Sequence, residues 1–190
     1  MAPTLRPGRA ARLKAATTDA HERLDRRIME LDPFASRLRY AAFVQVQHGF
    51  HTALAPLYAD HELGLLIPDL TRRSRLDAIE ADLADLDRPL PPPAAALDLG
   101  PAAALGWLYV AEGSSLGAAI LLRHAAALKL RPDFGARHLA GHEAGRSAHW
   151  RSFTAALDAA PLAMADDDRM IEAARDAFAR FRALAERELG

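Results

Sequence analysis

The chain has 190 residues, of which 51% are hydrophobic and 26% are charged. This composition is typical of a globular domain with a full hydrophobic core and excludes a disordered chain. The formal net charge of -1 argues against a general nucleic-acid or anionic-membrane surface. Because cysteine is absent, disulfides, thiolate metal sites and a cysteine nucleophile are excluded, and a cytoplasmic location is expected.

Helical periodicity dominates the sequence, and convincing alternation of period two is missing. The sequence therefore predicts an all-α bundle with helices at 8–31, 36–62, 70–86, 101–130, 141–157 and 166–189. Residues 1–8 are expected to be flexible, and the prolines within 87–100 to form a stiff link between helices. Because both sides of this link are too short to fold alone, we expect one domain, residues 1–190.

The first predicted helix carries a candidate metal ligand, His21. A neutral imidazole on a rigid helix is a good axial ligand for heme iron. Lys14 lies seven residues earlier, two turns away on the same face, where a cation can pair with a heme propionate. On spacing alone, however, a surface histidine beside an ordinary lysine is the more usual interpretation.

The fourth predicted helix contains the most apolar stretch, residues 102–122, which is long enough to span a bilayer. It also contains Glu112, three glycines and two serines, so we expect a buried helix of a soluble bundle. Gly113 and Gly117 share one face, although each interior glycine costs roughly 0.5–1 kcal/mol relative to alanine. They favour close approach of a flat ligand, a kink, or a contact between small residues of two helices, and physics alone leaves these open.

Four stretches, taken in order, resemble the heme oxygenase family, and specifically its iron-uptake branch in Gram-negative bacteria. They are residues 13–25, 33–37, 105–119 and 134–140, and the third contains Glu-Gly-Ser-Ser-Leu-Gly-Ala-Ala at 112–119. The resemblance extends over about residues 13–184. The phytochrome-linked bacterial heme oxygenases share the Glu-Gly-Ser-x-Leu-Gly pattern and are the next most similar group.

The resemblance implies a helical fold that holds heme between the first, proximal helix and a kinked distal helix. His21 matches the proximal iron ligand, and Gly113 and Gly117 match the distal glycines over the other heme face. Ser114 stands where mammalian-type enzymes carry a catalytic aspartate, so a backbone and ordered-water route replaces that carboxylate. The implied activity is opening of heme b to biliverdin with O2, releasing ferrous iron and carbon monoxide, for heme-iron acquisition.

Further site residues follow from the same resemblance. Gln47 and His51 match positions linked to the distal water network, and their spacing of four agrees with a shared inward face. An ordinary structural hydrogen bond explains that pair equally well. Phe178 is expected to line the pocket or to belong to the core. Lys14 and Tyr109 match residues that hold a propionate in members opening the α-meso edge, which predicts biliverdin IXα.

The implied electron donor is an NADPH-dependent reductase or a ferredoxin. Arg23, Arg26 and Arg27 can mark its docking face, although a solvated helix face is the simpler interpretation. A monomer is the default expectation, without nucleic-acid or membrane partners, and the sequence does not decide between iron scavenging and chromophore supply.

Three alternatives remain beside the enzyme. A non-catalytic heme carrier or gas sensor on the same fold is the first. A di-iron or thiamine-degrading enzyme is disfavoured, because no histidine has an acid three residues before it and cysteine is absent. A structural helical module without a ligand leaves Gly113 and Gly117 without a strong reason.

Overall fold

The computed structural model describes residues 7–190 and confirms the predicted all-α fold. The helices in chain order are α1 (Arg9–Glu30), α2 (Arg37–Ala59), α3 (His61–Leu66), α4 (Leu70–Arg73), α5 (Leu76–Asp85), α6 (Pro101–Ala127), the short 3₁₀ helix η1 (Arg137–Leu139), α7 (Arg146–Ala159) and α8 (Asp166–Leu189). The expectation for residues 1–8 falls mostly outside the described residues.

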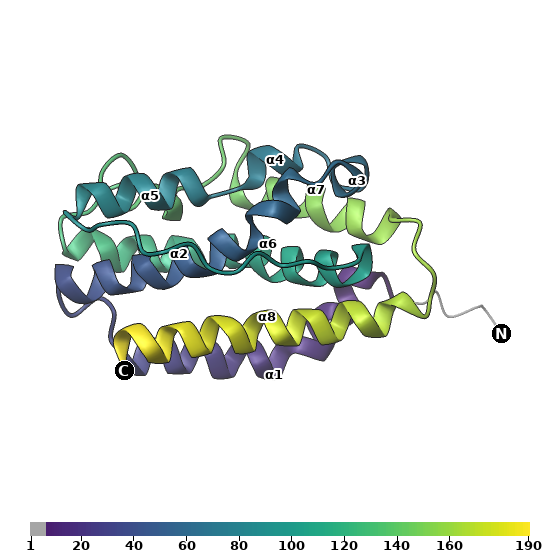
Figure 1. Ribbon diagram of the computed structural model, residues 1–190, viewed down its shortest axis with the longest axis horizontal. Coiled ribbons are helices and arrows are strands. Elements are labelled where there is room, and N and C mark those ends of the chain that lie inside the picture. The colour runs from purple at the N-terminus through teal and green to yellow at the C-terminus, as the bar shows by residue number, and fades with distance from the viewer. Residues whose placement is uncertain (1–6) are drawn as a thin grey trace.

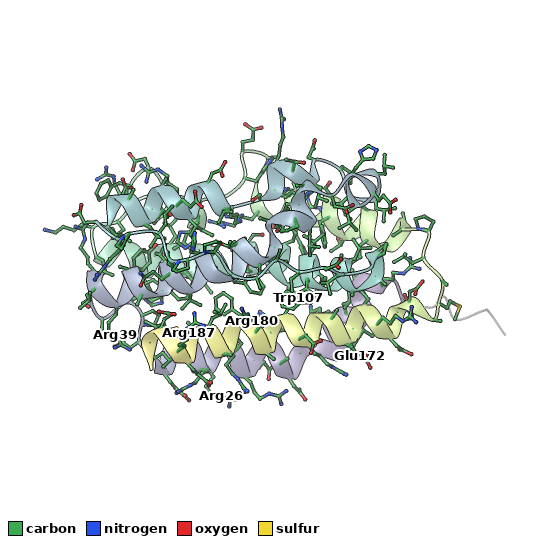
Figure 2. All side chains as sticks on the ribbon, viewed as in Figure 1. Arg26, Arg39, Trp107, Glu172, Arg180 and Arg187 are labelled. Atoms are coloured by element: carbon green, nitrogen blue, oxygen red, sulfur yellow. The ribbon has the colours of Figure 1, made fainter. Side chains whose placement is uncertain are left out.

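Helices α1 and α8 run side by side in the same direction along one edge of the bundle (Figure 1). Arg9 pairs with Asp167 where the two helices begin, at 2.9 Å, and Arg27 pairs with Glu186 near their ends, at 3.3 Å. Helix α8 also packs against α2 and α6, so it is the helix around which the other long helices gather. Charged side chains such as Arg26 project from the outer side of this pair (Figure 2).

Some predicted helix boundaries are wrong, and local backbone chemistry explains why. The helix predicted to reach residue 62 breaks at Asp60, whose extended backbone lets its side chain accept a hydrogen bond from Leu63 N at 2.8 Å. This bond caps α3. A second break at residues 74–75 separates α4 from α5. The fifth helix starts only after Gly145, which has a φ of 87°, a conformation that favours glycine.

Helix α6 is the apolar helix, and its flanks are covered by α8, α7, α2 and η1. By length and composition it could cross a membrane, but 56% of its most apolar window is buried inside the bundle. Gly106 lets its backbone approach α8 closely, because a Cβ there would lie 2.2 Å from the carbonyl oxygen of Met170. Ser114 donates a hydrogen bond to Ala111 O at 2.7 Å, a back-bond that tends to bend helices. The kink itself stays a prediction.

The segment 88–100 has no regular secondary structure, and Leu97 N donates to Ala53 O at 3.1 Å. This bond fixes the segment to α2, so the segment runs along the bundle surface before Pro101 starts α6 at a first-turn position.

Candidate functional site

Two contacts connect α6 with the α1 side of the bundle. The hydroxyl of Tyr109 lies beside the side chain of Thr17 on α1. Fifteen residues further along α6, the ring of His124 lies 5.3 Å from that of Phe34, which follows α1. From the first contact to the second, the residue numbers increase both along α6 and along the α1 side. The two helices therefore run in the same direction.

Between these two contacts, the same face of α6 contains two residues without side chains, Gly113 and Gly117. Nothing lies within 4 Å of the position that a Cβ of Gly117 would occupy, and a Cβ at Gly113 would make only ordinary contact with Trp150, at 3.5 Å. The apolar side chains of Leu116 and Ile120 are 41% and 51% exposed on this face. Packing within the described chain therefore does not require glycine at 117, and apolar surface is available for a ligand.

His21 lies one turn after Thr17 on α1, and its side chain is 58% exposed. Its Nδ1 is 3.2 Å from a carboxylate oxygen of Asp25. Such a contact favours the tautomer that keeps the proton on Nδ1 and leaves the Nε2 lone pair available to a metal. The ring also meets Phe178 edge-on, with centroids 5.8 Å apart. Asp25 was missed in the sequence, although an acid four residues after a candidate ligand is a recognisable signal.

The register of the two helices brings the predicted proximal and distal residues to the same level. A helix rises about 1.5 Å per residue, so His21 lies about 6 Å beyond Thr17, and Gly113 about 6 Å beyond Tyr109. Because Thr17 and Tyr109 lie beside each other, His21 on α1 and Gly113 on α6 each lie one turn beyond the same contact. An imidazole on one side and side-chain-poor backbone on the other fit a flat, metal-centred ligand.

The other predicted site residues have different environments. Lys14 and Ser114 are exposed, Tyr109 and Phe178 are buried, and Gln47 is half-buried on α2. His51 is buried, and burial together with the positive charge of Arg75 lowers its pKa to about 3. The imidazole of His51 is therefore neutral at physiological pH, which suits a hydrogen-bonding role.

A buried ion pair beside the glycines was also missed in the sequence. Glu112 directly precedes Gly113 and bonds Arg73 at 2.9 Å. Burial raises the pKa of Glu112, while Arg73 and the Tyr58 hydroxyl oppose this rise. The sequence treated Glu112 only as a polar interruption of an apolar helix, and no local spacing predicted a partner 39 residues away.

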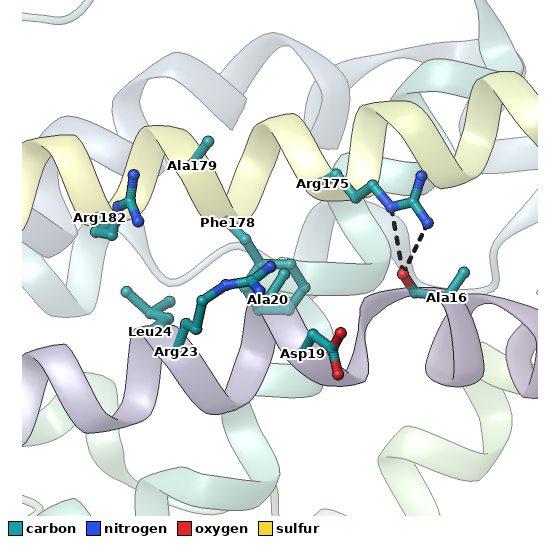
Figure 3. Close-up of a pocket in the computed structure, with 9 residues that line it drawn as sticks. All are labelled: Ala16, Asp19, Ala20, Arg23, Leu24, Arg175, Phe178, Ala179 and Arg182. Atoms are coloured by element: carbon teal, nitrogen blue, oxygen red, sulfur yellow. Dashed lines mark hydrogen bonds between the residues drawn. The ribbon is translucent and has the colours of Figure 1, made fainter.

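On the other side of His21, α1 and α8 enclose a groove of about 370 Å³. Figure 3 shows three arginines around it, Arg23, Arg175 and Arg182, together with the ring of Phe178. Arg175 donates from Nε and one terminal nitrogen to Ala16 O, both at 3.2 Å. Arg23 and Arg182 also line an adjoining groove that contains Arg26 and Arg27.

Comparisons with known proteins assign the chain to a family. A profile of the heme oxygenase family matches residues 8–187. The chain is 47% identical over 182 residues to heme oxygenase PigA of Pseudomonas aeruginosa, covering 94% of this chain and 92% of that protein. The chain belongs to the heme oxygenase family.

Solved structures show the same relationship. The NO- and CO-bound heme oxygenase from Neisseria meningitidis superposes with a TM-score of 0.93 at 40% identity, covering 97% of this chain and 94% of that one. Heme oxygenase-1 of the cyanobacterium Synechocystis, in complex with heme, gives a TM-score of 0.74 at 17% identity, covering 95% and 92%. The second likeness concerns the fold alone.

Proposed function

We propose that this protein is a heme oxygenase that opens heme b to biliverdin and releases ferrous iron and carbon monoxide for heme-iron acquisition. The observation that carries this proposal is that His21 on α1 and Gly113 on α6 each lie one turn beyond the contact between Thr17 and Tyr109. The exposed Leu116 and Ile120 beside Gly117 fit the apolar face of a porphyrin. Family membership supports the same function.

Within this site, each predicted residue has a definable task. His21 binds the heme iron through Nε2, while Asp25 holds the proton on Nδ1. Gly113 and Gly117 let the distal backbone approach the ring, which side chains would prevent. Ser114, Gln47 and His51 are proposed to hold ordered water on that distal side, and neutral His51 can accept or donate a hydrogen bond there. Heme supplies the iron that activates O2 and the ring that is opened.

Lys14 and Tyr109 are proposed to set the rotation of heme, and with it the product biliverdin IXα. Both lie on the side of His21 where Tyr109 of α6 contacts Thr17 of α1. The exposed ammonium of Lys14 is available to a propionate.

We propose further that the electron donor is an acidic ferredoxin or NADPH-dependent reductase that docks on the arginines of the α1–α8 groove. Arg23 and Arg175 supply positive charge at its rim, and Phe178 at its base touches the ring of His21. Phe178 therefore lies between this groove and His21, the proposed heme ligand. We propose a monomer, because one chain supplies all of these groups, and a cytoplasmic location, because the chain contains no cysteine.

Titration with hemin, followed by ascorbate in air, tests the activity. We expect a Soret band that saturates at one hemin per chain, then its bleaching with formation of biliverdin. A stable Soret band in the presence of ascorbate and air would instead identify a heme carrier or sensor. Failure to form any ligated complex would overturn both.

A further inference from the structure

Glu112 is tied to two other helices directly before Gly113. It is 6% exposed, and both of its carboxylate oxygens are bonded. The Tyr58 hydroxyl of α2 donates to Oε1 at 3.0 Å, and the Arg73 guanidinium of α4 donates to Oε2 at 2.9 Å. The backbone of α6 is therefore fixed at the residue that begins the glycine-containing face.

Arg73 is itself buried, and its donors reach a further helix. Its guanidinium donates to His149 O at 3.4 Å and to the hydroxyl of Ser152 at 3.3 Å, both on α7. Its Nε donates to Pro68 O at 3.0 Å. One guanidinium thus joins α6 to α7 and to the turn before α4.

Helix α7 contacts Gly113 directly. The ring of Trp150, the residue after His149, lies 3.5 Å from the position of a Cβ on Gly113. The same ring lies 5.4 Å from that of Tyr109. Arg73 therefore holds both the residue that precedes Gly113 and the helix that places an aromatic ring against Gly113.

Overall stability is a weak reason to keep such a pair. Taking two charges out of water is costly, and replacement of a buried ion pair by well-packed apolar residues is often neutral or stabilising. We therefore attribute this ion pair to the geometry that it fixes. Here that geometry is the position of the α6 backbone at Gly113 relative to α4 and α7.

We propose that Arg73 and Glu112 are positioning residues that set how far the Gly113 backbone extends toward His21. The proposal rests on the proposed function, because it assigns them a part in placing the distal face over heme. Neither side chain needs to contact the ligand. Their loss is expected to affect ring opening more than heme binding, since the bonds to α4 and α2 fix geometry rather than supply ligand contacts.

The chain offers a matched control for the test. Asp167 on α8 is also 6% exposed, and its carboxylate accepts bonds from Arg9 at 2.9 Å and Arg12 at 2.5 Å. Glu112→Gln and Asp167→Asn therefore each remove the charge of an arginine-paired carboxylate of the same exposure, although Arg9 and Arg12 are more exposed than Arg73. Amide hydrogen exchange of residues 113–117 is measured in the heme-free protein, and hemin affinity and ascorbate-driven ring opening in the loaded protein.

For Glu112→Gln we expect exchange of these amides to accelerate about tenfold and ring opening to slow about tenfold, with hemin affinity changed less than about threefold. Asp167→Asn is expected to leave all three measurements as in the unchanged protein. Equal behaviour of the two variants, or unchanged exchange and turnover in Glu112→Gln, would overturn the proposal. Amide exchange is measured in the heme-free protein, so it still tests the positioning role if the unchanged protein does not open heme. Failure of the positioning proposal and failure of the proposed function are therefore distinguishable.

If Glu112→Gln does not fold, Tyr58→Phe replaces it, because this change keeps the ion pair and removes one bond to Glu112. We expect exchange of residues 113–117 to accelerate about threefold, since one neutral hydrogen bond is lost. Unchanged exchange in Tyr58→Phe would then refute the positioning role.

Discussion

The hydroxyl of Tyr109 on α6 lies beside the side chain of Thr17 on α1. The Thr17 hydroxyl itself donates to Leu13 O at 2.7 Å, so its one proton is used within α1. This contact joins α1 and α6 one turn before His21 on one helix and one turn before Gly113 on the other. It also holds the phenol beside the proposed position of a propionate.

Tyr109→Phe is expected to broaden the biliverdin isomers beyond IXα, since heme would lose one of its two proposed propionate partners. The free energy of unfolding of the heme-free protein should change by less than about 1 kcal/mol, because only one hydroxyl is removed. Chromatography against isomer standards measures the isomer ratio. Thr17→Ser, which keeps a hydroxyl beside Tyr109, is the control, and an unaltered isomer ratio in Tyr109→Phe would contradict the propionate assignment.

Two glycines of α6 should respond in opposite ways to alanine. Gly106→Ala places a methyl group 2.2 Å from Met170 O, so we expect a loss of about 1–3 kcal/mol of stability. Gly117→Ala meets nothing within 4 Å and should stabilise the heme-free protein by about 0.5–1 kcal/mol, as alanine favours helix. Thermal unfolding of the heme-free variants measures both changes. A stability loss in Gly117→Ala would mean that its conformation, rather than a ligand, requires glycine.

Gly113→Leu is expected to block turnover more than heme binding. A leucine side chain would begin 3.5 Å from the Trp150 ring, so it would have to displace that ring or the α6 backbone and would disturb the close approach that the reaction needs. Hemin titration and ascorbate-driven turnover separate the two effects. Equal loss of affinity and turnover would show that Gly113 is only a packing position.

His21→Ala should abolish the ligation spectrum of bound hemin while changing the unfolding free energy by less than about 0.5 kcal/mol, because the side chain is largely exposed. Absorption and resonance Raman spectra of the hemin complex measure ligation. Added imidazole is expected to restore the spectrum in the variant. An unaltered spectrum without imidazole would contradict the proposed ligand.

Acid should destabilise the protein through its buried histidines. Burial lowers the pKa of His51 to about 3, and burial beside Arg73 lowers the pKa of His149 to about 4. The unfolded chain then binds more protons below about pH 6.5, so stability is lost as pH falls through that value. His51 alone should account for about 2 kcal/mol between about pH 6.5 and pH 5. Urea unfolding at several pH values tests this, and His51→Leu should flatten the dependence.

Much of the fold could be predicted from sequence because helices with one apolar face repeat locally. The last helix begins at Asp166 and ends at Leu189, as its acidic first turn and periodicity indicated. The break at Asp60 was missed because periodicity alone does not mark it; its signal is the local cap in which Asp60 accepts from Leu63 N.

The residues of the candidate site could also be predicted only in part. His21 could be assigned from its resemblance to a known ligand, whereas Asp25 and Thr17 became evident only through their contacts. The Arg73–Glu112 pair joins residues 39 positions apart, and such a pairing depends on tertiary structure rather than on spacing.

The backbone contact at Gly106 makes α8 a mechanical link between the two sides of the site. Because a Cβ at Gly106 would lie 2.2 Å from Met170 O, the backbones of α6 and α8 are in close contact there, and we expect a shift of α6 to move α8 with it. Further along α8, Phe178 touches the edge of His21. If the proposed site is right, strain on the oxygen side of the pigment would reach the imidazole through a third helix, without passing through the pigment itself.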